Sequence, residues 1–239
     1  MIKIQKIIDE LIEKYYMDTT KAINIENIIK DLNIRIVTAD IGTGILGASK
    51  VIGLKQLIVI SPNTYNEAQR NFTLAHELGH ILLHRGTHYY LEKDYYTVKE
   101  KEDEANQFAS KILLPDSEVK KSVKNLDINI NLIKDIANRY KTSITCTAIK
   151  ILEITEETIF LIYHKNNQIK WWRKSNNEIF FNTSYSEIDL ERLETKQDIA
   201  TRKTDINLWI DSDDDIYSCY EETVYFNNLD EYLTIISIV

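Results

Sequence analysis

In the N-terminal part of the chain, hydrophobic residues recur first at helical spacing and then, further along, at the spacing of β-strands. Residues 2–16 repeat isoleucine and leucine every three or four positions, which predicts an amphipathic helix. Residues 24–32 predict a second, shorter helix. Residues 34–38 and 56–60 are typical of buried strands, and 45–53 is a weaker strand candidate. The glycines clustered around this weaker strand indicate turns or a close approach of backbone.

The middle of the chain is predominantly helical in pattern. One helix is predicted over 66–84 and another over 100–113, which ends before Pro115. Residues 85–99 between them show no regular period and are expected to be irregular. Two short helices are predicted over 131–140 and 144–152, joined by a three-residue turn.

Beyond residue 156 the pattern changes to short runs of β-branched and aromatic residues, such as TIFLIYH and YLTIISIV. These runs predict a sheet-rich unit, in which one helix could occupy residues 187–197. The sequence therefore predicts an α+β protein with a small mixed sheet near its beginning. Three parts are expected, over residues 1–118, 119–155 and 156–239.

Composition narrows the class of protein. The chain has 239 residues, of which 44% are hydrophobic and 28% charged, so it can build a core. Its net charge of −8 argues against a main role in coating nucleic acid. The two cysteines, Cys146 and Cys219, are far apart and indicate neither a disulfide framework nor a cysteine zinc site. Acidic residues interrupt the apolar N-terminal run, and no segment is long enough to span a bilayer, so we expect a cytoplasmic protein.

Residues 76–80 read HELGH, which matches the HExxH pattern of zinc enzymes. His76 and His80 are four positions apart on a predicted helix, so their imidazoles lie on one face and can reach a single Zn²⁺. Glu77 lies beside them, where a general base is needed. The flanking residues are apolar, and a buried helix would otherwise have to find partners for all three polar groups. The motif therefore predicts a metal site.

The third ligand must come from elsewhere. The longer pattern HExxHxxGxxH would need glycine at 83 and histidine at 86, where this chain has Leu83 and Gly86. His84 and His88 continue the four-residue spacing of the motif. A straight helix cannot bring three successive residues of that spacing onto one tetrahedral ion. His84 is therefore expected to support the site from outside the coordination sphere, and His88 to face solvent.

The helix predicted over 100–113 offers the better ligand. At about 100° per residue, Glu102 falls inside the apolar stripe of this helix, and Glu104 falls at its margin. A carboxylate on a buried stripe needs a cation. Glu102 is therefore the favoured ligand and Glu104 the alternative. Asn106, one turn further on, is placed to hydrogen-bond a ligand imidazole from behind.

Two segments resemble the ImmA/IrrE family of metallopeptidases, namely NFTLAHELGHILLH at 71–84 and EDEANQFASKILLP at 102–115. The spacing of Glu102 to the Ala-Asn pair that follows also resembles the ligand helix of gluzincins. The resemblance implies a zincin-like domain over 1–118 that holds one zinc ion through His76, His80 and Glu102, with Glu77 as general base. It further implies a cytosolic endopeptidase, often encoded on a mobile genetic element. Such enzymes cleave a helix-turn-helix repressor and so release stress or excision genes.

Two other functions stay open. Residues 131–152 have the layout of a helix-turn-helix, and the segment 119–153 carries a charge of 7 − 3 = +4, so DNA binding is an alternative. A helical hairpin that only packs on the peptidase is the favoured interpretation, because the second helix offers no arginine for reading guanine. The residues that it is expected to expose are Thr142, Thr145, Thr147 and Lys150. The chain could also act as a binding regulator whose metallopeptidase site is latent.

The remaining expectations concern substrate recognition. An extended peptide could pair with the edge of the strand at 45–53. Candidates for holding the oxyanion are aromatic or imidazole side chains of the predicted loop: His88, Tyr89, Tyr90, Tyr95 and Tyr96. Residues 156–239 are expected to sense a ligand or recognise the substrate. Their charge of 8 − 17 = −9 would suit a basic partner such as a DNA-binding repressor.

Overall fold

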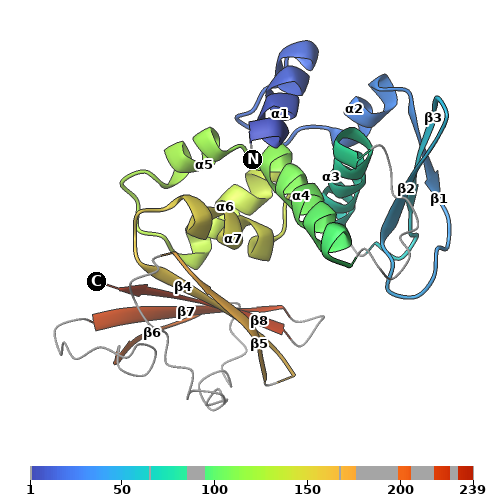
Figure 1. Cartoon of the computed structure of the whole chain (residues 1–239). Helices are drawn as coiled ribbons and strands as arrows, with labels where there is room; N and C mark the ends of the chain where they lie inside the picture. The colour runs from blue at the N-terminus through green and yellow to red at the C-terminus, as the bar shows by residue number, and fades with distance from the viewer. Residues whose placement is uncertain are drawn as a thin grey trace. The chain divides into compact units, whose positions relative to one another are not determined.

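The computed structural model describes residues 2–64, 66–84, 95–166, 168–175, 199–205, 218–226 and 231–238. The protein is α+β, as the sequence predicts, with a small mixed sheet and a separate antiparallel sheet (Figure 1). It divides into two compact units. The first consists of Met1–Glu118 and Ala137–Ser143, and the second of Val119–Ile136 and Ile144–Val239. No helix in the described part of the chain is long and apolar enough to cross a membrane.

The first unit contains four helices and three strands in the order α1, α2, β1, β2, β3, α3, α4. Their bounds are α1 Ile2–Tyr15, α2 Ile25–Asp31, β1 Ile34–Thr38, β2 Gly47–Ile52, β3 Lys55–Ile60, α3 Glu67–His84 and α4 Tyr95–Leu113. Local signals fix several of these ends. The Asn24 side chain caps α2 by accepting a hydrogen bond from the Asn27 backbone N–H at 3.0 Å. Asn33, with φ of 58°, takes the left-handed conformation that ends the helix.

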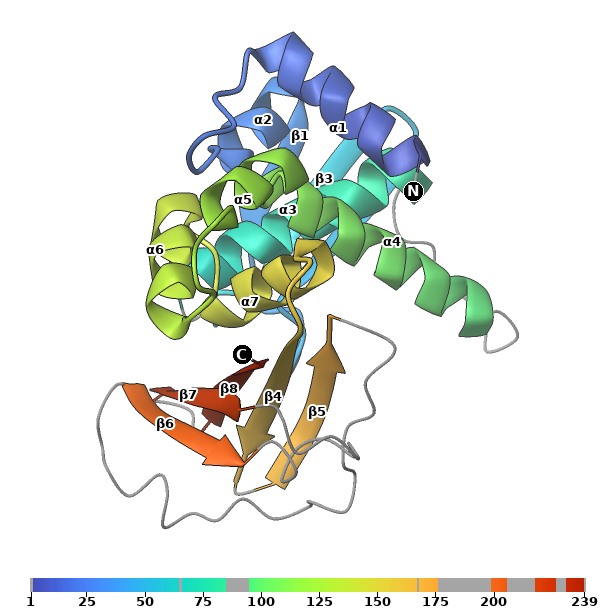
Figure 2. The same ribbon diagram turned by 90° about the vertical axis from the view of Figure 1, so that its left-hand side faces the viewer.

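The three strands of this unit form a mixed sheet in the order β1-β3-β2. β1 runs parallel to β3, and β2 runs antiparallel to it. The sheet and the helices beside it are seen from another side in Figure 2. β2 is an edge strand, and within the described residues it pairs with β3 alone. One row of its backbone groups is therefore available to another strand.

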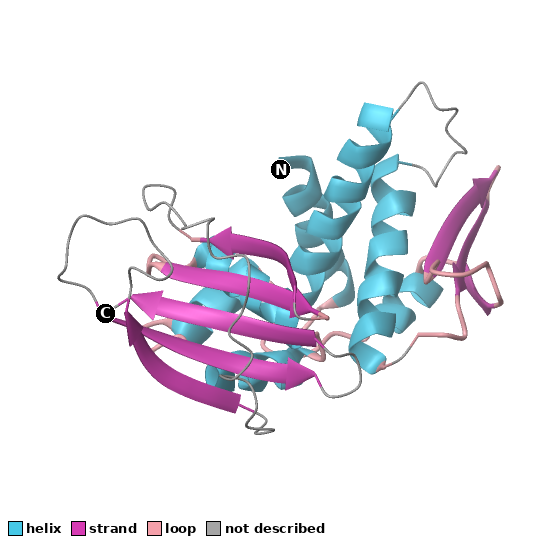
Figure 3. Cartoon of the chain, turned by 90° about the horizontal axis from the view of Figure 1, so that it is seen from below, coloured by secondary structure: helices cyan, strands magenta, loops and turns pink. Residues whose placement is uncertain are grey.

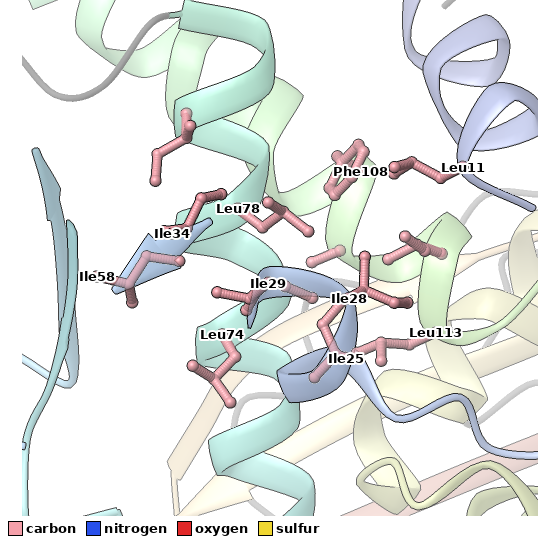
Figure 4. Close-up of a cluster of buried hydrophobic side chains, with 14 of the residues drawn as sticks. Leu11, Ile25, Ile28, Ile29, Ile34, Ile58, Leu74, Leu78, Phe108 and Leu113 are labelled. Atoms are coloured by element: carbon pink, nitrogen blue, oxygen red, sulfur yellow. The ribbon is translucent and has the colours of Figure 1, made fainter. Parts of the chain in front are cut away.

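The core of the first unit gathers around α3, which contacts β2, β3, α2 and α4 (Figure 4). Its central side chains come from six elements and are fully or almost fully buried: Leu11, Ile25, Ile29, Ile34, Ile58, Leu74, Leu78 and Phe108. Gly79 lets α3 and α4 pack closely, since a Cβ atom there would lie 3.2 Å from the Ala105 Cα. This close packing fixes the side chains of α4 relative to those of α3.

The helical part differs from the sequence-based expectation at two places. α4 begins at Tyr95, so the prediction of irregular structure over 85–99 is wrong for residues 95–99. An additional helix, α5, spans Asp116–Val123. Pro115 separates α4 from α5 because it lacks the N–H that would continue α4, while its fixed φ suits the beginning of a new helix.

The C-terminal strands form a five-stranded antiparallel sheet in the order β5-β4-β8-β7-β6 (Figure 3). The strands are β4 Ile159–Lys165, β5 Gln168–Lys174, β6 Ile199–Asp205, β7 Ser218–Phe226 and β8 Glu231–Ile238. β4 contacts helix α7 (Ile144–Ile154), which follows α6 (Ile130–Tyr140). The predicted helical pair and sheet-rich region are both confirmed. The helix expected at 187–197 lies outside the described residues.

Candidate metal centre

Helices α3 and α4 bring three potential metal ligands together. His76 and His80 lie one turn apart on α3, and their Nε2 atoms are 3.0 Å from each other. Glu102 reaches both from α4, with Oε2 at 3.2 Å from the His76 Nε2 and Oε1 at 3.2 Å from the His80 Nε2. Among the described residues, these three form the one cluster of histidine, cysteine and acidic side chains with the spacing of a metal site.

The geometry of the cluster fits a zinc ion. Tetrahedral zinc with bonds of about 2.0–2.1 Å to nitrogen and oxygen separates its ligand atoms by about 3.3 Å. The two Nε2 atoms are 3.0 Å apart, and each lies 3.2 Å from a different carboxylate oxygen of Glu102. Taking one ligand atom from each residue, all three lie within 4.8 Å of one another. Two imidazole nitrogens and a carboxylate are also ligands that zinc accepts. Three protein ligands would leave the fourth position for a water or substrate oxygen, as catalytic zinc sites do.

Glu102 is less buried than its place on the apolar stripe suggests. Its side chain is 46% exposed, whereas Ala105, Phe108 and Ala109 on the same helix are completely buried. Hydrogen bonds from His76 and His80 lower the pKa of Glu102 well below its usual range. The carboxylate is therefore held ionised by the two imidazoles rather than by burial.

Each candidate histidine ligand has a partner at its other ring nitrogen. The Nδ1 atom of His76 lies 2.9 Å from the Oδ1 atom of Asn106 on α4. The Nδ1 atom of His80 lies 3.2 Å from the Nδ1 atom of His84, one turn further along α3. The Nε2 atom of His84 in turn lies 2.7 Å from Oε2 of Glu104. The structure thus places Glu104 against His84 and outside the group of three.

Opposing effects set the pKa values of these histidines. Burial alone would lower the pKa of His76, but the charges of Glu102 and Glu77 and the bond to Asn106 together raise it. Burial lowers the pKa of His84, and its contact with Glu104 opposes that effect only in part. His84 is consequently favoured as a neutral imidazole.

Glu77 lies buried on α3 between the two histidines and the sheet. It is 5% exposed, and its Oε2 atom has no hydrogen-bond partner among the described residues. Burial raises the pKa of Glu77, and a hydrogen bond from the Ser49 side chain of β2 opposes this shift. A buried carboxylate oxygen without a donor is costly, which is typical of an atom reserved for a reaction.

The approach of β2 to this carboxylate was not predictable from the sequence. A Cβ atom built on Gly47 would lie 3.1 Å from the Glu77 Cγ and Oε1 atoms. The glycine cluster was the available signal, but nothing local shows which glycine faces which side chain. Beside this strand, an open pocket of about 460 Å³ lies between residues 40–46 and residues 61–64.

Comparison with known proteins identifies the family of this chain. Residues 29–152 match the model of the peptidase M78 family, described as the IrrE N-terminal-like domain. The chain belongs to the peptidase M78 family. The matched segment begins in α2 and ends in α7, so it contains all the ligand candidates and both helices of the helix-turn-helix layout.

Two individual proteins are similar to this M78 family member. The first is an uncharacterized immunity region protein 2 of Bacillus phage phi105, which is 35% identical over 115 residues. That alignment covers 47% of this chain and 69% of the phage protein. The second is a solved Mycobacterium tuberculosis transcriptional regulator with a TM-score of 0.65 and 12% identity. The match covers 99% of this chain and 75% of the regulator. At this sequence identity the match shows a shared fold.

The structure corrects one expectation about the helix-turn-helix layout. The second helix was expected to expose Thr142, Thr145, Thr147 and Lys150, the residues available for contacts with DNA. Thr147 is completely buried, Lys150 is 2% exposed and Thr142 is 8% exposed. Thr145 is half-buried, so three of the four residues expected to contact DNA are covered in this M78 protein.

Several expected residues cannot be placed with the site. His88, Tyr89 and Tyr90 lie outside the described residues. Tyr95 and Tyr96 form the beginning of α4. In the second unit, Trp171 stacks on Tyr163 with ring centroids 5.2 Å apart, an ordinary aromatic pair on neighbouring strands.

Proposed function

We propose that this protein is a zinc-dependent endopeptidase whose substrate is a helix-turn-helix transcriptional repressor. The observation that carries the proposal is the convergence of His76, His80 and Glu102 beside a buried Glu77 oxygen that has no partner among the described residues. Membership of the M78 family supports peptidase chemistry at the level of the family. We further propose that the enzyme acts in the cytoplasm.

The residues of the site would divide the reaction between them. When bound, zinc would polarise the scissile carbonyl and make water a better nucleophile. Glu77 would take a proton from the attacking water and pass it to the leaving nitrogen. Its burial suits this role, since the raised pKa favours holding the proton between the two transfers. Asn106 would keep the imidazole of His76 in the required orientation.

The substrate chain would bind as an extended strand. β2 is an edge strand and lies against Glu77 through Gly47, so a peptide paired with it would pass close to the general base. The pocket between residues 40–46 and 61–64 adjoins β2 and could receive a substrate side chain. This mode of binding needs no free chain end, which favours an endopeptidase.

A repressor as substrate is supported by the similar protein from a phage immunity region. Cleavage of such a repressor by this protein would release genes of a mobile element. The −9 charge of residues 154–239 supports the same choice, because DNA-binding proteins present basic surfaces. A sensory or substrate-recognition role for residues 156–239 belongs to this proposal.

The decisive experiment compares the wild type with Glu77→Gln and with Glu10→Gln, a matched substitution at an exposed position of α1. Each protein is mixed with the repressor encoded beside its gene, and the fragments are identified by mass spectrometry. Metal analysis should give about one zinc per chain for all three proteins. The repressor should be cut by the wild type and by Glu10→Gln, and left intact by Glu77→Gln.

Other outcomes would point elsewhere. Zinc-free wild-type protein, or cleavage that survives Glu77→Gln, would reject the mechanism. Zinc binding with tight repressor binding but no cleavage would favour a binding regulator with a latent site. A salt-sensitive shift of duplex DNA by the protein alone would revive the DNA-binding alternative despite the buried face of α7.

A further inference from the structure

His80 is connected to a second imidazole and a carboxylate on the side away from the metal cluster. Its Nδ1 atom lies 3.2 Å from the Nδ1 atom of His84, and the Nε2 atom of His84 lies 2.7 Å from Oε2 of Glu104. The side chains of His80 and His84 are only 4% and 5% exposed. Water therefore has little access to the nitrogen–nitrogen contact, and each atom depends on the other as a partner.

The direction of each hydrogen bond in the row His80–His84–Glu104 follows from the carboxylate of Glu104. An ionised carboxylate can only accept, so the Nε2 atom of His84 carries the hydrogen that it donates to Glu104. The Nδ1 atom of a neutral His84 then has a free lone pair and accepts from the Nδ1–H of His80. His80 consequently keeps a lone pair on Nε2, the atom that faces Glu102 and His76. The reverse order would put a hydrogen on that atom and prevent coordination.

We propose that His84, held by Glu104, is a positioning residue that fixes the tautomer and ring orientation of His80 for zinc. This inference rests on the zinc site of the proposed function and adds a role for two residues outside the coordination sphere. His76 is oriented in the same way by a single amide, the side chain of Asn106. The two histidine ligands are thus oriented by different chemical groups, and the row behind His80 can be changed without touching His76.

Two substitutions of His84 separate orientation from packing. His84→Asn keeps an oxygen acceptor close to the position of Nδ1, whereas His84→Leu fills similar space without any acceptor. Loss of such outer partners typically weakens metal binding about 10–100-fold. We expect that loss for His84→Leu and only a few-fold change, roughly threefold, for His84→Asn. Glu104→Ala should weaken binding less than His84→Leu, because the Glu104 side chain is 47% exposed and water can replace it.

The measurement is the Zn²⁺ dissociation constant, obtained by competition with a chromophoric chelator, together with the absorption spectrum of the Co²⁺-substituted protein. Thermal unfolding of the metal-free variants monitors packing separately. Wild-type affinity in His84→Leu would overturn the proposal. Equal weakening in His84→Asn and His84→Leu would also overturn it, because loss of shape and not of an acceptor would then be the cause.

Failure of this inference is distinguishable from failure of the proposed function. A wild-type protein that binds zinc and shows the expected order of affinities, but does not cut the repressor, would reject the substrate and keep the role of His84. A protein that cuts the repressor with unchanged affinity in His84→Leu would reject only the role of His84. Absence of zinc binding in the wild type would reject both.

Discussion

Replacing Gly47 by alanine tests whether β2 holds the general base in place. The added Cβ atom would lie 2.5 Å from the Thr73 Cγ2 atom and 3.1 Å from the Glu77 Cγ and Oε1 atoms. Carbon atoms in favourable contact are about 3.5–4.0 Å apart, so the first contact is too short by about 1 Å. Either the Thr73 side chain, the Glu77 side chain or β2 itself must move.

Each of these movements lowers the free energy of unfolding. Thr73 is held by a hydrogen bond of 2.9 Å from its hydroxyl to the Gln69 backbone oxygen, and losing it costs about 1 kcal/mol. Overpacking in general costs about 1–3 kcal/mol. Alanine regains about 0.5–1 kcal/mol relative to glycine within a strand. We therefore expect Gly47→Ala to lower the free energy of unfolding by about 0.5–2 kcal/mol, which leaves the protein folded.

The effect on catalysis should be larger than the effect on stability. A displacement of about 1 Å in a catalytic group can cost about 100-fold in rate. We expect kcat/KM for repressor cleavage to fall about 10–100-fold in Gly47→Ala, while the zinc content stays unchanged because no ligand is touched. Urea unfolding, metal analysis and a cleavage time course measure the three quantities separately.

The double variant Gly47→Ala/Thr73→Ser locates the cause. Serine removes Cγ2 but keeps the hydroxyl that bonds Gln69, so stability should recover. The contact with Glu77 remains, so the rate should stay low. Thr73→Ser alone serves as the control. Wild-type kcat/KM in Gly47→Ala would refute the reasoning, and so would full recovery of the rate in the double variant.

Three further outcomes are expected. Gly79→Ala should weaken Zn²⁺ binding measurably, because a Cβ there lies 3.2 Å from the Ala105 Cα and pushes on the helix that carries Glu102. Its stability loss should stay below about 2 kcal/mol, since overpacking is partly offset by the helix propensity of alanine. Burial lowers the pKa of His164 from 6.5 to about 4, so the folded state binds fewer protons between these values and stability falls as pH drops through this window. This group accounts for about 3 kcal/mol of that loss, which His164→Phe should abolish in urea titrations at pH 7 and pH 4. Repressor cleavage below substrate saturation should slow as salt rises, if the acidic C-terminal part attracts a basic substrate.

Contrary results are equally specific. Unchanged zinc affinity in Gly79→Ala would mean that α4 tolerates the extra methyl group without moving Glu102. An identical loss of stability on acidification in the wild type and in His164→Phe would assign the pH dependence to other groups. A cleavage rate that does not respond to salt would remove the electrostatic argument for a basic partner, though not the argument for peptidase chemistry.

The parts of the site that lie on one element were predictable from the sequence. His76, Glu77 and His80 follow from helical spacing. The apolar stripe of the next helix singled out Glu102, although that side chain is 46% exposed and not buried as the stripe implied. The contact between Gly47 and Glu77 was not predictable, because it depends on how β2 packs against α3. Local periodicity contains no information about such an approach.

The same limit explains the errors in the helical region. Lys150 and Thr147 are polar residues on a short amphipathic helix, so the sequence favours a solvent-facing side. Both are buried in the folded protein, which the pattern of the helix alone does not show. The beginning of α4 at Tyr95 was missed because residues 95–99 have no helical period of apolar residues. Burial and helix ends of this kind are decided by tertiary packing and not by local pattern.

The charged groups around the two imidazoles favour a cation at the candidate metal site. His76 and His80 turn their Nε2 atoms toward each other at 3.0 Å, and the carboxylates of Glu77 and Glu102 add negative charge around them. Burial lowers the pKa of His76, but the neighbouring carboxylates raise it overall, and hydrogen bonds from His76 and His80 lower the pKa of Glu102. The site therefore favours positive charge on the imidazoles beside a negative carboxylate. A proton can supply positive charge to only one of the two Nε2 atoms at a time. A divalent ion can interact with both nitrogens and the Glu102 carboxylate at once, because it accepts all three as ligands. We therefore propose that this cluster holds a divalent metal ion, for which zinc is the favoured candidate.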